Sequence, residues 1–216
     1  EQNTAIINGL AGTGKTVMAI EKARRHSEKG EDVLFLCYNS FLKQHLKETY
    51  PYPHVYYFTI DGLACKLCDN NAPNYKLLKT KLEKMLIDGT FPYQHVIIDE
   101  GQDFGKIETE EENLIELLKA NAIDDENKKG TFYLFYDKNQ IIQSRRLPKY
   151  IKDADCKLTL YRNCRNTENI ALTSLRLLGY ENKPKLISDA VMGDIPEISF
   201  ANNVEETVNV VNTLID

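Results

Sequence analysis

The feature that most constrains the fold is a glycine-rich segment between an apolar run and a helical pattern. Residues 9–16 are Gly-Leu-Ala-Gly-Thr-Gly-Lys-Thr, which fits G-x-x-x-x-G-K-[ST] in full. The apolar run at residues 4–8 comes before it, and helical periodicity from about Lys15 to His26 follows it. A strand that turns through glycines into a helix is the setting in which this motif forms a phosphate-binding loop.

This loop predicts a nucleotide-binding site. Glycines let backbone N–H groups approach phosphate oxygens, and the helix N-terminus adds a partial positive charge. Lys15 is placed to reach the β- and γ-phosphates, and Thr16 can offer its hydroxyl to Mg²⁺. The alternative is a glycine-rich turn with an exposed lysine. The predicted nucleotide-binding residues are Gly9, Ala11, Gly12, Thr13, Gly14, Lys15 and Thr16.

An acidic pair, Asp99 and Glu100, follows the apolar run at residues 95–98. In open α/β folds, ligands bind in the crevice at the carboxyl ends of the strands. We expect Asp99 to hold Mg²⁺, through water, and Glu100 to act as the general base that orients the attacking water. The alternative is a pair that caps a following helix. Two adjacent acids favour nucleotide hydrolysis over phosphoryl transfer to a small substrate.

Apolar runs and helical patterns alternate along the whole chain. Continuous apolar runs are typical of strands buried on both faces. They predict an α/β fold with a mostly parallel sheet flanked by helices. Hydrophobic residues make up 42% and charged residues 27%, as in ordinary globular proteins, and no run is long enough to span a membrane. The further runs lie at residues 33–38, 55–58 and 131–136, with helices expected at about 41–48, 108–129 and 204–216 and a short strand at 195–200.

Five cysteines cannot all pair, and no secretory signal is present at the N-terminus, so we expect a cytoplasmic protein with no membrane partner. Cys65 and Cys68 form a C-x-x-C pair. A structural zinc site needs a second pair of ligands, and no other Cys/Cys or Cys/His pair is closely spaced in the sequence. The spacing of three also puts both thiols on the leucine face of a helix. We therefore interpret them as buried structural residues rather than as a metal or redox site.

Six segments occur in the order found in superfamily 1 helicases of the UvrD/Rep type. After the P-loop, residues 99–104 (DEGQDF) resemble the D-E-x-Q-D box, and residues 136–140 (YDKNQ) resemble a strand that ends in G-D-x-x-Q. Residues 160–170 (LYRNCRNTENI) resemble the segment that opens the second motor domain, and residues 36–39 and 58–63 resemble two segments that contact a single strand. The chain is therefore similar to this family, which implies a RecA-like ATP-binding domain and the beginning of a second one.

The resemblance implies further roles. Gln140 would sense the γ-phosphate, and Gln102 with Asp103 would link the hydrolytic site to the polynucleotide path. Arg165 would act as an arginine finger, with a surface cation as the alternative. Single-stranded DNA, or RNA, would be the partner, and its contacts would be Tyr38, Asn39 and Thr59. Tyr38 at a strand end is equally consistent with a rim aromatic.

The resemblance also divides the chain. Residues 1–158 would be the motor domain, with a small helical insert at about 72–90, and residues 159–216 a linker and a truncated second domain. Tyr136 and Cys164 replace a glycine and a tyrosine of the family pattern. The chain ends before any segment that resembles the last two helicase boxes. We therefore expect a fragment whose partner is the rest of the same polypeptide and whose hydrolysis alone is slow or absent.

A competing hypothesis is a nucleotide-dependent regulatory switch that keeps the helicase core without strand separation. Too few residues separate Thr59 from Asp99 to hold the large inserted subdomain of UvrD-type enzymes. The formal net charge of −5 also favours this hypothesis over a motor that grips a polyanion.

Overall fold

The computed structural model describes residues 3–104, 111–123, 130–140, 151, 156–177, 179 and 185–215. Its contacts divide the chain into two units, Glu1–Tyr161 and Arg162–Asp216. The domain boundary expected between residues 158 and 159 falls inside strand β6 (Cys156–Leu160), which belongs to the first unit.

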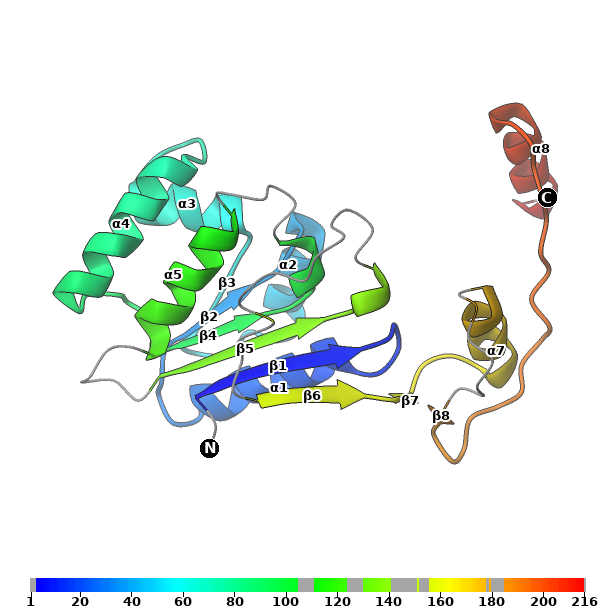
Figure 1. Cartoon of the computed structure of the whole chain (residues 1–216), viewed down its shortest axis with the longest axis horizontal. Helices are drawn as coiled ribbons and strands as arrows, with labels where there is room; N and C mark the ends of the chain where they lie inside the picture. The colour runs from blue at the N-terminus through cyan, green and yellow to red at the C-terminus, as the bar shows by residue number, and fades with distance from the viewer. Residues whose placement is uncertain are drawn as a thin grey trace. The chain divides into compact units, whose positions relative to one another are not determined.

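A parallel sheet forms the centre of the first unit (Figure 1). The order of its six strands is β3-β2-β4-β5-β1-β6, and every pairing between them is parallel. Strand β5 therefore lies between β1, which leads into the P-loop, and β4, which leads into the acidic pair. The strands other than β6 are β1 (Thr4–Gly9), β2 (Val33–Leu36), β3 (Val55–Phe58), β4 (His95–Ile98) and β5 (Thr131–Tyr136).

Helices cover both faces of this sheet. Helices α1 (Lys15–Ser27) and α2 (Ser40–Thr49) pack on one face. Helices α3 (Ile60–Cys68), α4 (Tyr75–Asp88) and α5 (Glu111–Ile123) form the layer on the other. Successive strand residues alternate between the two cores: Leu34 packs beneath α3–α5, and its neighbour Phe35 packs beneath α1 and α2. The predicted α/β class, with a mostly parallel sheet flanked by helices, is confirmed.

Helix α4 lies within the range 72–90 where a helical insert was expected. It begins after Asn74, whose side-chain oxygen accepts a hydrogen bond from the Leu77 N–H at 3.0 Å. It ends at Gly89, which takes the left-handed conformation with φ of 63°. Leu78 and Leu82, one turn apart, are fully buried in the core that α3, α4 and α5 share. Burial of this stripe places α4 in the helical layer of the first unit.

Cysteine placement agrees in part with the sequence interpretation. Cys68 is buried and packs in the α3–α5 core, whereas Cys65 is only half-buried. All five cysteines are free thiols. None of the helices in the described part of the chain is long and apolar enough to cross a membrane.

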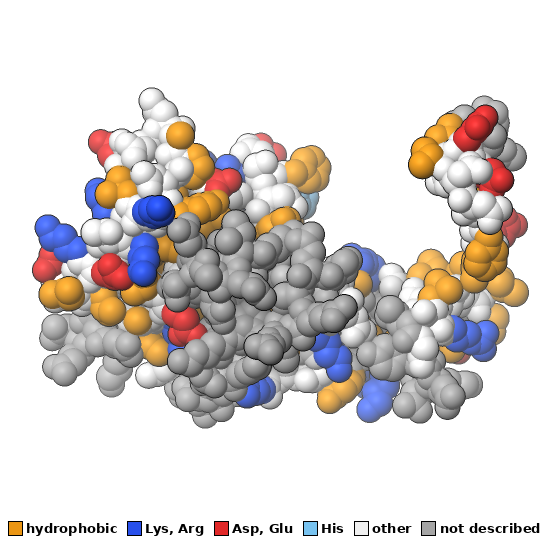
Figure 2. Space-filling view, turned by 45° about the horizontal axis from the view of Figure 1, so that its top comes forward, with side chains coloured by type: hydrophobic (Ala, Val, Ile, Leu, Met, Phe, Trp, Pro, Cys, Tyr) orange, Lys and Arg blue, Asp and Glu red, His pale blue; other side chains and the backbone are white. Residues whose placement is uncertain are grey.

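The second unit contains two short strands, β7 (Arg162–Asn163) and β8 (Lys185–Leu186), which pair in parallel. It also contains helices α7 (Glu168–Leu177) and α8 (Val204–Ile215), the latter close to where a terminal helix was expected. The strand expected at residues 195–200 was wrong: no described residue pairs with this segment. Without a partner for its backbone groups, an apolar run does not become a strand. Ile195 and Phe200 are 81% and 89% exposed, and hydrophobic side chains remain visible on the surface of this unit (Figure 2).

Candidate active site

The segment between β1 and α1 forms a tight loop. A Cβ on Gly9 would lie 2.4 Å from Thr13 Oγ1, so the loop closes only around a residue without a side chain. Gly12 and Gly14 take φ values of 81° and 85°, in the left-handed region. The Thr13 hydroxyl donates to the Leu10 carbonyl at 2.7 Å, and this hydrogen bond stabilises the closed shape of the loop. The sequence motif thus corresponds to a compact turn at the carboxyl end of β1.

The loop opens into the N-terminus of α1. Gly14 is the N-cap, and no side chain caps the first turn. The N–H groups of this turn are therefore left for an anion. The Lys15 ammonium is buried over the loop, where it donates to the carbonyls of Gly9 at 2.9 Å and Leu10 at 3.2 Å. A phosphate bound here would offer the same ammonium an anionic acceptor in place of neutral carbonyls.

Thr16 and Asp99 meet although 83 positions separate them in the sequence. The Thr16 hydroxyl donates to Asp99 Oδ2 at 2.7 Å. Asp99 is fully buried, and its other oxygen, Oδ1, has no hydrogen-bond partner among the described residues. Burial raises the pKa of Asp99 to about 6, and the neighbouring Glu100 charge acts in the same direction. A buried carboxylate oxygen without a partner beside a hydroxyl is a donor set that fits Mg²⁺, which prefers oxygen ligands.

Gln102 connects the acidic pair to the end of β5. Its amide nitrogen donates to Glu100 Oε2 at 2.6 Å, and its carbonyl oxygen accepts the backbone N–H of Asp137 at 2.9 Å. The same amide nitrogen lies 3.5 Å from Gln140 Oε1, at the outer limit of a hydrogen bond. Glu100 itself has φ of 56°, a left-handed conformation uncommon for a residue with a side chain. Three of the residues singled out in the sequence are thus brought into one network.

Two polar residues at strand ends were given no role by the sequence reasoning, although Asp137 lies in the segment that resembles G-D-x-x-Q. Asn8, near the end of β1, accepts the backbone N–H of Lys138 at 3.2 Å. Asp137 is buried and accepts the backbone N–H of Asn139 at 2.9 Å. Both hold the segment that carries Gln140, which lies in the short helix η2 (Lys138–Gln140). Their signal in the sequence was a polar residue at the end of an apolar run.

The three residues expected to contact nucleic acid follow β2 and β3. Tyr38 is 39% exposed, and its ring stands edge-on to Phe104 with centroids 6.1 Å apart. Asn39 caps α2 by accepting the Leu42 N–H at 2.7 Å, and Thr59 caps α3 by accepting the Gly62 N–H at 3.1 Å. Because β3, β2 and β4 are adjacent and parallel, these residues lie at the same edge of the sheet as Asp99. Asn39 and Thr59 therefore have a structural role, and contact with nucleic acid stays a prediction for all three.

Arg165 belongs to the second unit. Its side chain is exposed, and its backbone N–H donates to Asn163 Oδ1 at 3.0 Å. Asn166 donates to the same oxygen at 2.9 Å, so Asn163 orders the turn that carries the arginine. The role of Arg165 as an arginine finger stays a prediction.

A parallel sheet with a glycine loop, a lysine and a magnesium-compatible acid at its carboxyl edge defines an α/β P-loop NTPase. Within that class, the chain belongs to the family described as Schlafen group 3, DNA/RNA helicase domain, whose model matches residues 2–189.

Solved structures also match the chain. One of them is the flagellar accessory protein FlaH from Methanocaldococcus jannaschii, with 13% identity and a TM-score of 0.40. The match covers 69% of this chain and 65% of FlaH, so the chain spans slightly less than two thirds of that protein. No curated protein matches the chain significantly.

Proposed function

We propose that this chain is the Mg²⁺-ATP-binding and hydrolysing core of a superfamily 1 helicase-like ATPase that acts on single-stranded nucleic acid. The observation that carries the proposal is the contact between Thr16 and Asp99, at 2.7 Å. It unites the phosphate loop and the acidic strand in one site. The family match to a DNA/RNA helicase domain supports the nucleic-acid part of the proposal.

The residues divide the chemistry between them. The loop amides and Lys15 bind the β- and γ-phosphates, while Thr16 and Asp99 would hold the magnesium ion, which supplies positive charge to the transferring phosphoryl group. Glu100 orients the attacking water and accepts its proton. Gln102 keeps the Glu100 carboxylate in place through their 2.6 Å hydrogen bond. Because Gln102 also bonds to Asp137, a change at Glu100 can reach the segment that carries Gln140.

We assign the nucleic-acid contact to the residues that follow β2 and β3. Tyr38 offers an exposed aromatic face for base stacking, and Asn39 and Thr59 lie at the beginnings of the following helices. Arg165, in the second unit, would neutralise charge on the phosphoryl group once ATP is bound. On the face of the first unit shown in Figure 2, basic and acidic side chains are interspersed. We assign the contact to the edge of the sheet because Tyr38, Asn39 and Thr59 follow adjacent parallel strands there.

Nucleotide binding and hydrolysis are tested with the 216-residue chain and three variants. Lys15→Ala should abolish ATP binding measured by calorimetry, and Glu100→Gln should bind ATP but lose any slow hydrolysis that the parent shows. Lys47→Ala, which removes an exposed lysine from α2, is the matched control and should bind as the parent does. Binding that survives in Lys15→Ala would contradict the nucleotide site.

Coupling to nucleic acid is tested by adding single-stranded DNA or RNA oligonucleotides to the chain joined to the complete second motor domain that the proposal requires, since slow or absent hydrolysis is expected of the 216 residues alone. We expect faster hydrolysis in the parent and loss of that stimulation in Tyr38→Ala at unchanged ATP affinity. If ATP binding is intact but no oligonucleotide changes the rate of hydrolysis, the proposed movement on nucleic acid is contradicted. The proposed nucleotide site is not affected by that result.

A regulatory switch is the second candidate, and one observation favours it. Only α3 and α4 occur between β3 and β4, so a large inserted subdomain is missing there. Affinity for an oligonucleotide across a salt series separates the two functions. A motor that engages several phosphates weakens steeply as salt rises, whereas a switch that binds a protein partner shows no such steep loss of oligonucleotide affinity.

A further inference from the structure

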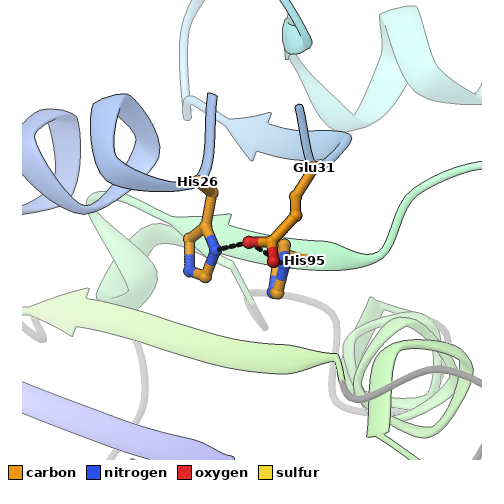
Figure 3. Close-up of side chains that lie close together, drawn as sticks. All are labelled: His26, Glu31 and His95. Carbon is orange, nitrogen blue, oxygen red and sulfur yellow. Dashed lines mark hydrogen bonds and ion pairs between the residues drawn. The ribbon is translucent and has the colours of Figure 1, made fainter. Parts of the chain in front are cut away.

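Three ionisable side chains meet at the edge of the sheet opposite to the P-loop (Figure 3). His26 lies in the last turn of α1, Glu31 in the segment before β2, and His95 at the first position of β4. Their candidate ligand atoms all lie within 4.8 Å of one another. His26 Nδ1 is 2.6 Å from Glu31 Oε2, and His95 Nε2 is 3.1 Å from the same oxygen. The proposed ATPase uses none of these groups.

The environment keeps both rings in the form that binds metals. The side chains of His26 and His95 are only 3% and 2% exposed. This burial lowers the pKa of both histidines, that of His95 to about 4, and so favours the uncharged rings. Glu31 is 26% exposed and gives the cluster its access to solvent. Neutral imidazole with a free lone pair is the commonest metal ligand in proteins.

Hydrogen bonds around the cluster leave one nitrogen unsatisfied. Without a metal, we assign each neutral ring one N–H that it donates to Glu31 Oε2. His95 Nδ1 then accepts from the Thr131 hydroxyl at 2.9 Å. If an ion takes His95 Nε2, the ring proton moves to Nδ1 and donates to Thr131, as metal-binding histidines commonly donate to a second oxygen. His26 Nε2 is buried and has no hydrogen-bond partner among the described residues.

The two rings are stacked, with centroids 3.5 Å apart and planes inclined by 24°. Imidazole lone pairs lie in the ring plane, so one ring must turn about its Cβ–Cγ bond before both nitrogens can face one ion. Lys22 and Lys29 act electrostatically on His26 and oppose a cation. Binding would therefore have a structural signature: the stack opens, and the imidazole resonances of both histidines change together.

We propose that His26, Glu31 and His95 form a binding site for a divalent transition-metal ion of the Zn²⁺ type. Two imidazole nitrogens and one carboxylate are a set that Zn²⁺ accepts in four-coordinate sites with one open position. Mg²⁺ and Ca²⁺ prefer sets made of oxygens alone, so they are not the expected ions. The open position lies on the side of Glu31, where the cluster reaches solvent.

The ion would act as a clamp on the fold. It would join the end of α1, the segment before β2 and the start of β4, and so add to the backbone hydrogen bonds that already link them, from the Glu31 N–H to the His26 carbonyl and from the His95 N–H to the Asp32 carbonyl, both at 3.1 Å. From Lys15 to His26 the rise along α1 is about 16 Å, so the ion would not touch a nucleotide bound at the P-loop. We therefore expect it to raise thermal stability and to leave ATP affinity unchanged.

The experiment uses the 216-residue chain after chelator treatment and titrates Co²⁺ alone, then Zn²⁺ alone. Co²⁺ reports its own ligands, because four-coordinate nitrogen and oxygen sites give visible absorption whereas thiolates add a strong near-ultraviolet band. His26→Gln and Glu31→Gln keep side chains that can hydrogen-bond and remove one ligand each. The matched control is His45→Gln/His54→Gln, which removes the two other histidines of the chain, both exposed.

We expect the parent and the double control to bind one Co²⁺ with visible absorption and no thiolate band, and Zn²⁺ to raise their melting temperatures. His26→Gln and Glu31→Gln should bind at least about tenfold more weakly, which corresponds to the loss of about 1.4 kcal/mol. Circular dichroism of each variant checks its fold. Absence of binding in the parent, equal binding in the folded variants, or a thiolate band that disappears in Cys65→Ser/Cys68→Ser would each overturn the proposal.

Discussion

The Thr16 hydroxyl donates a 2.7 Å hydrogen bond to Asp99 Oδ2 and so joins the beginning of α1 to the residue after β4. The two strands that lead into these residues are not neighbours, because β5 lies between them. The contact therefore depends on the parallel arrangement of three strands whose carboxyl ends meet at one edge.

Thr16 is expected to govern how much magnesium improves nucleotide binding. Thr16→Ala removes the hydroxyl, and we expect the gain in ATP affinity on adding Mg²⁺ to fall by roughly tenfold or more, since hydrogen bonds to charged groups contribute about 1.5–3 kcal/mol. Thr16→Ser keeps the hydroxyl and should retain most of the gain. Calorimetric titrations with and without Mg²⁺ measure the effect. Equal Mg²⁺ dependence in the alanine and serine variants would remove Thr16 from the proposed metal site.

Asp99→Asn is expected to stabilise the protein in the absence of magnesium. The pKa of Asp99 is raised from 3.8 to about 6, so the folded state holds this proton more tightly than the unfolded state. The free energy of unfolding therefore falls as pH rises from about 4 to about 6. Above this window, burial of the charged Asp99 carboxylate lowers it by at most about 3 kcal/mol. The amide avoids this cost, although its N–H groups also need acceptors in the buried site.

Urea unfolding across a pH series tests this expectation. The difference between Asp99→Asn and the parent should be small near pH 4 and reach a plateau above pH 6. Mg²⁺ with ATP should then stabilise the parent and not the variant. A difference that stays constant across the pH range would show that burial of the Asp99 charge is not its cause.

Gly101→Ala is expected to destabilise the first unit. A Cβ at this position would lie 2.6 Å from Cδ2 and 2.7 Å from Cγ of Leu134, a fully buried side chain of β5. We expect a loss of about 1–3 kcal/mol in the free energy of unfolding, because a packed core yields little to an added methyl group. Leu134→Ala removes the clashing atoms. The double variant should therefore lose less than the two single variants together, and strict additivity would contradict the clash.

Gln102→Ala is expected to impair both stability and hydrolysis. It leaves the buried end of β5 without an acceptor for the Asp137 N–H, which costs about 1–2 kcal/mol, and it frees the Glu100 carboxylate. Unfolding curves and single-turnover hydrolysis measure the two effects. Gln44→Ala on the exposed side of α2 is the matched control and should change neither. Parent-like hydrolysis in Gln102→Ala would rule out its positioning of Glu100.

The five apolar runs at residues 4–8, 33–38, 55–58, 95–98 and 131–136 correspond to β1–β5, because strands buried on both faces need continuous apolar sequence. Strand β6 was missed because it lies at the edge of the sheet, where Lys157 to Thr159 are exposed and apolar residues are not required. The run at residues 195–200, by contrast, was predicted to be a strand and forms none. Apolar character marks a strand only where a partner is present, and partners come from distant parts of the chain.

The sequence by itself determined the P-loop and the acidic pair, because local spacing fixes a strand, a glycine turn and a helix start. The tertiary structure decided which residues meet: Thr16 with Asp99, Gln102 with both Glu100 and Asp137, and His26 with Glu31 and His95. Neither histidine carries a motif, and 69 positions separate them in the chain. Only the placement of α1 along the sheet brings them together, since helix packing and strand order set distances that no local pattern encodes.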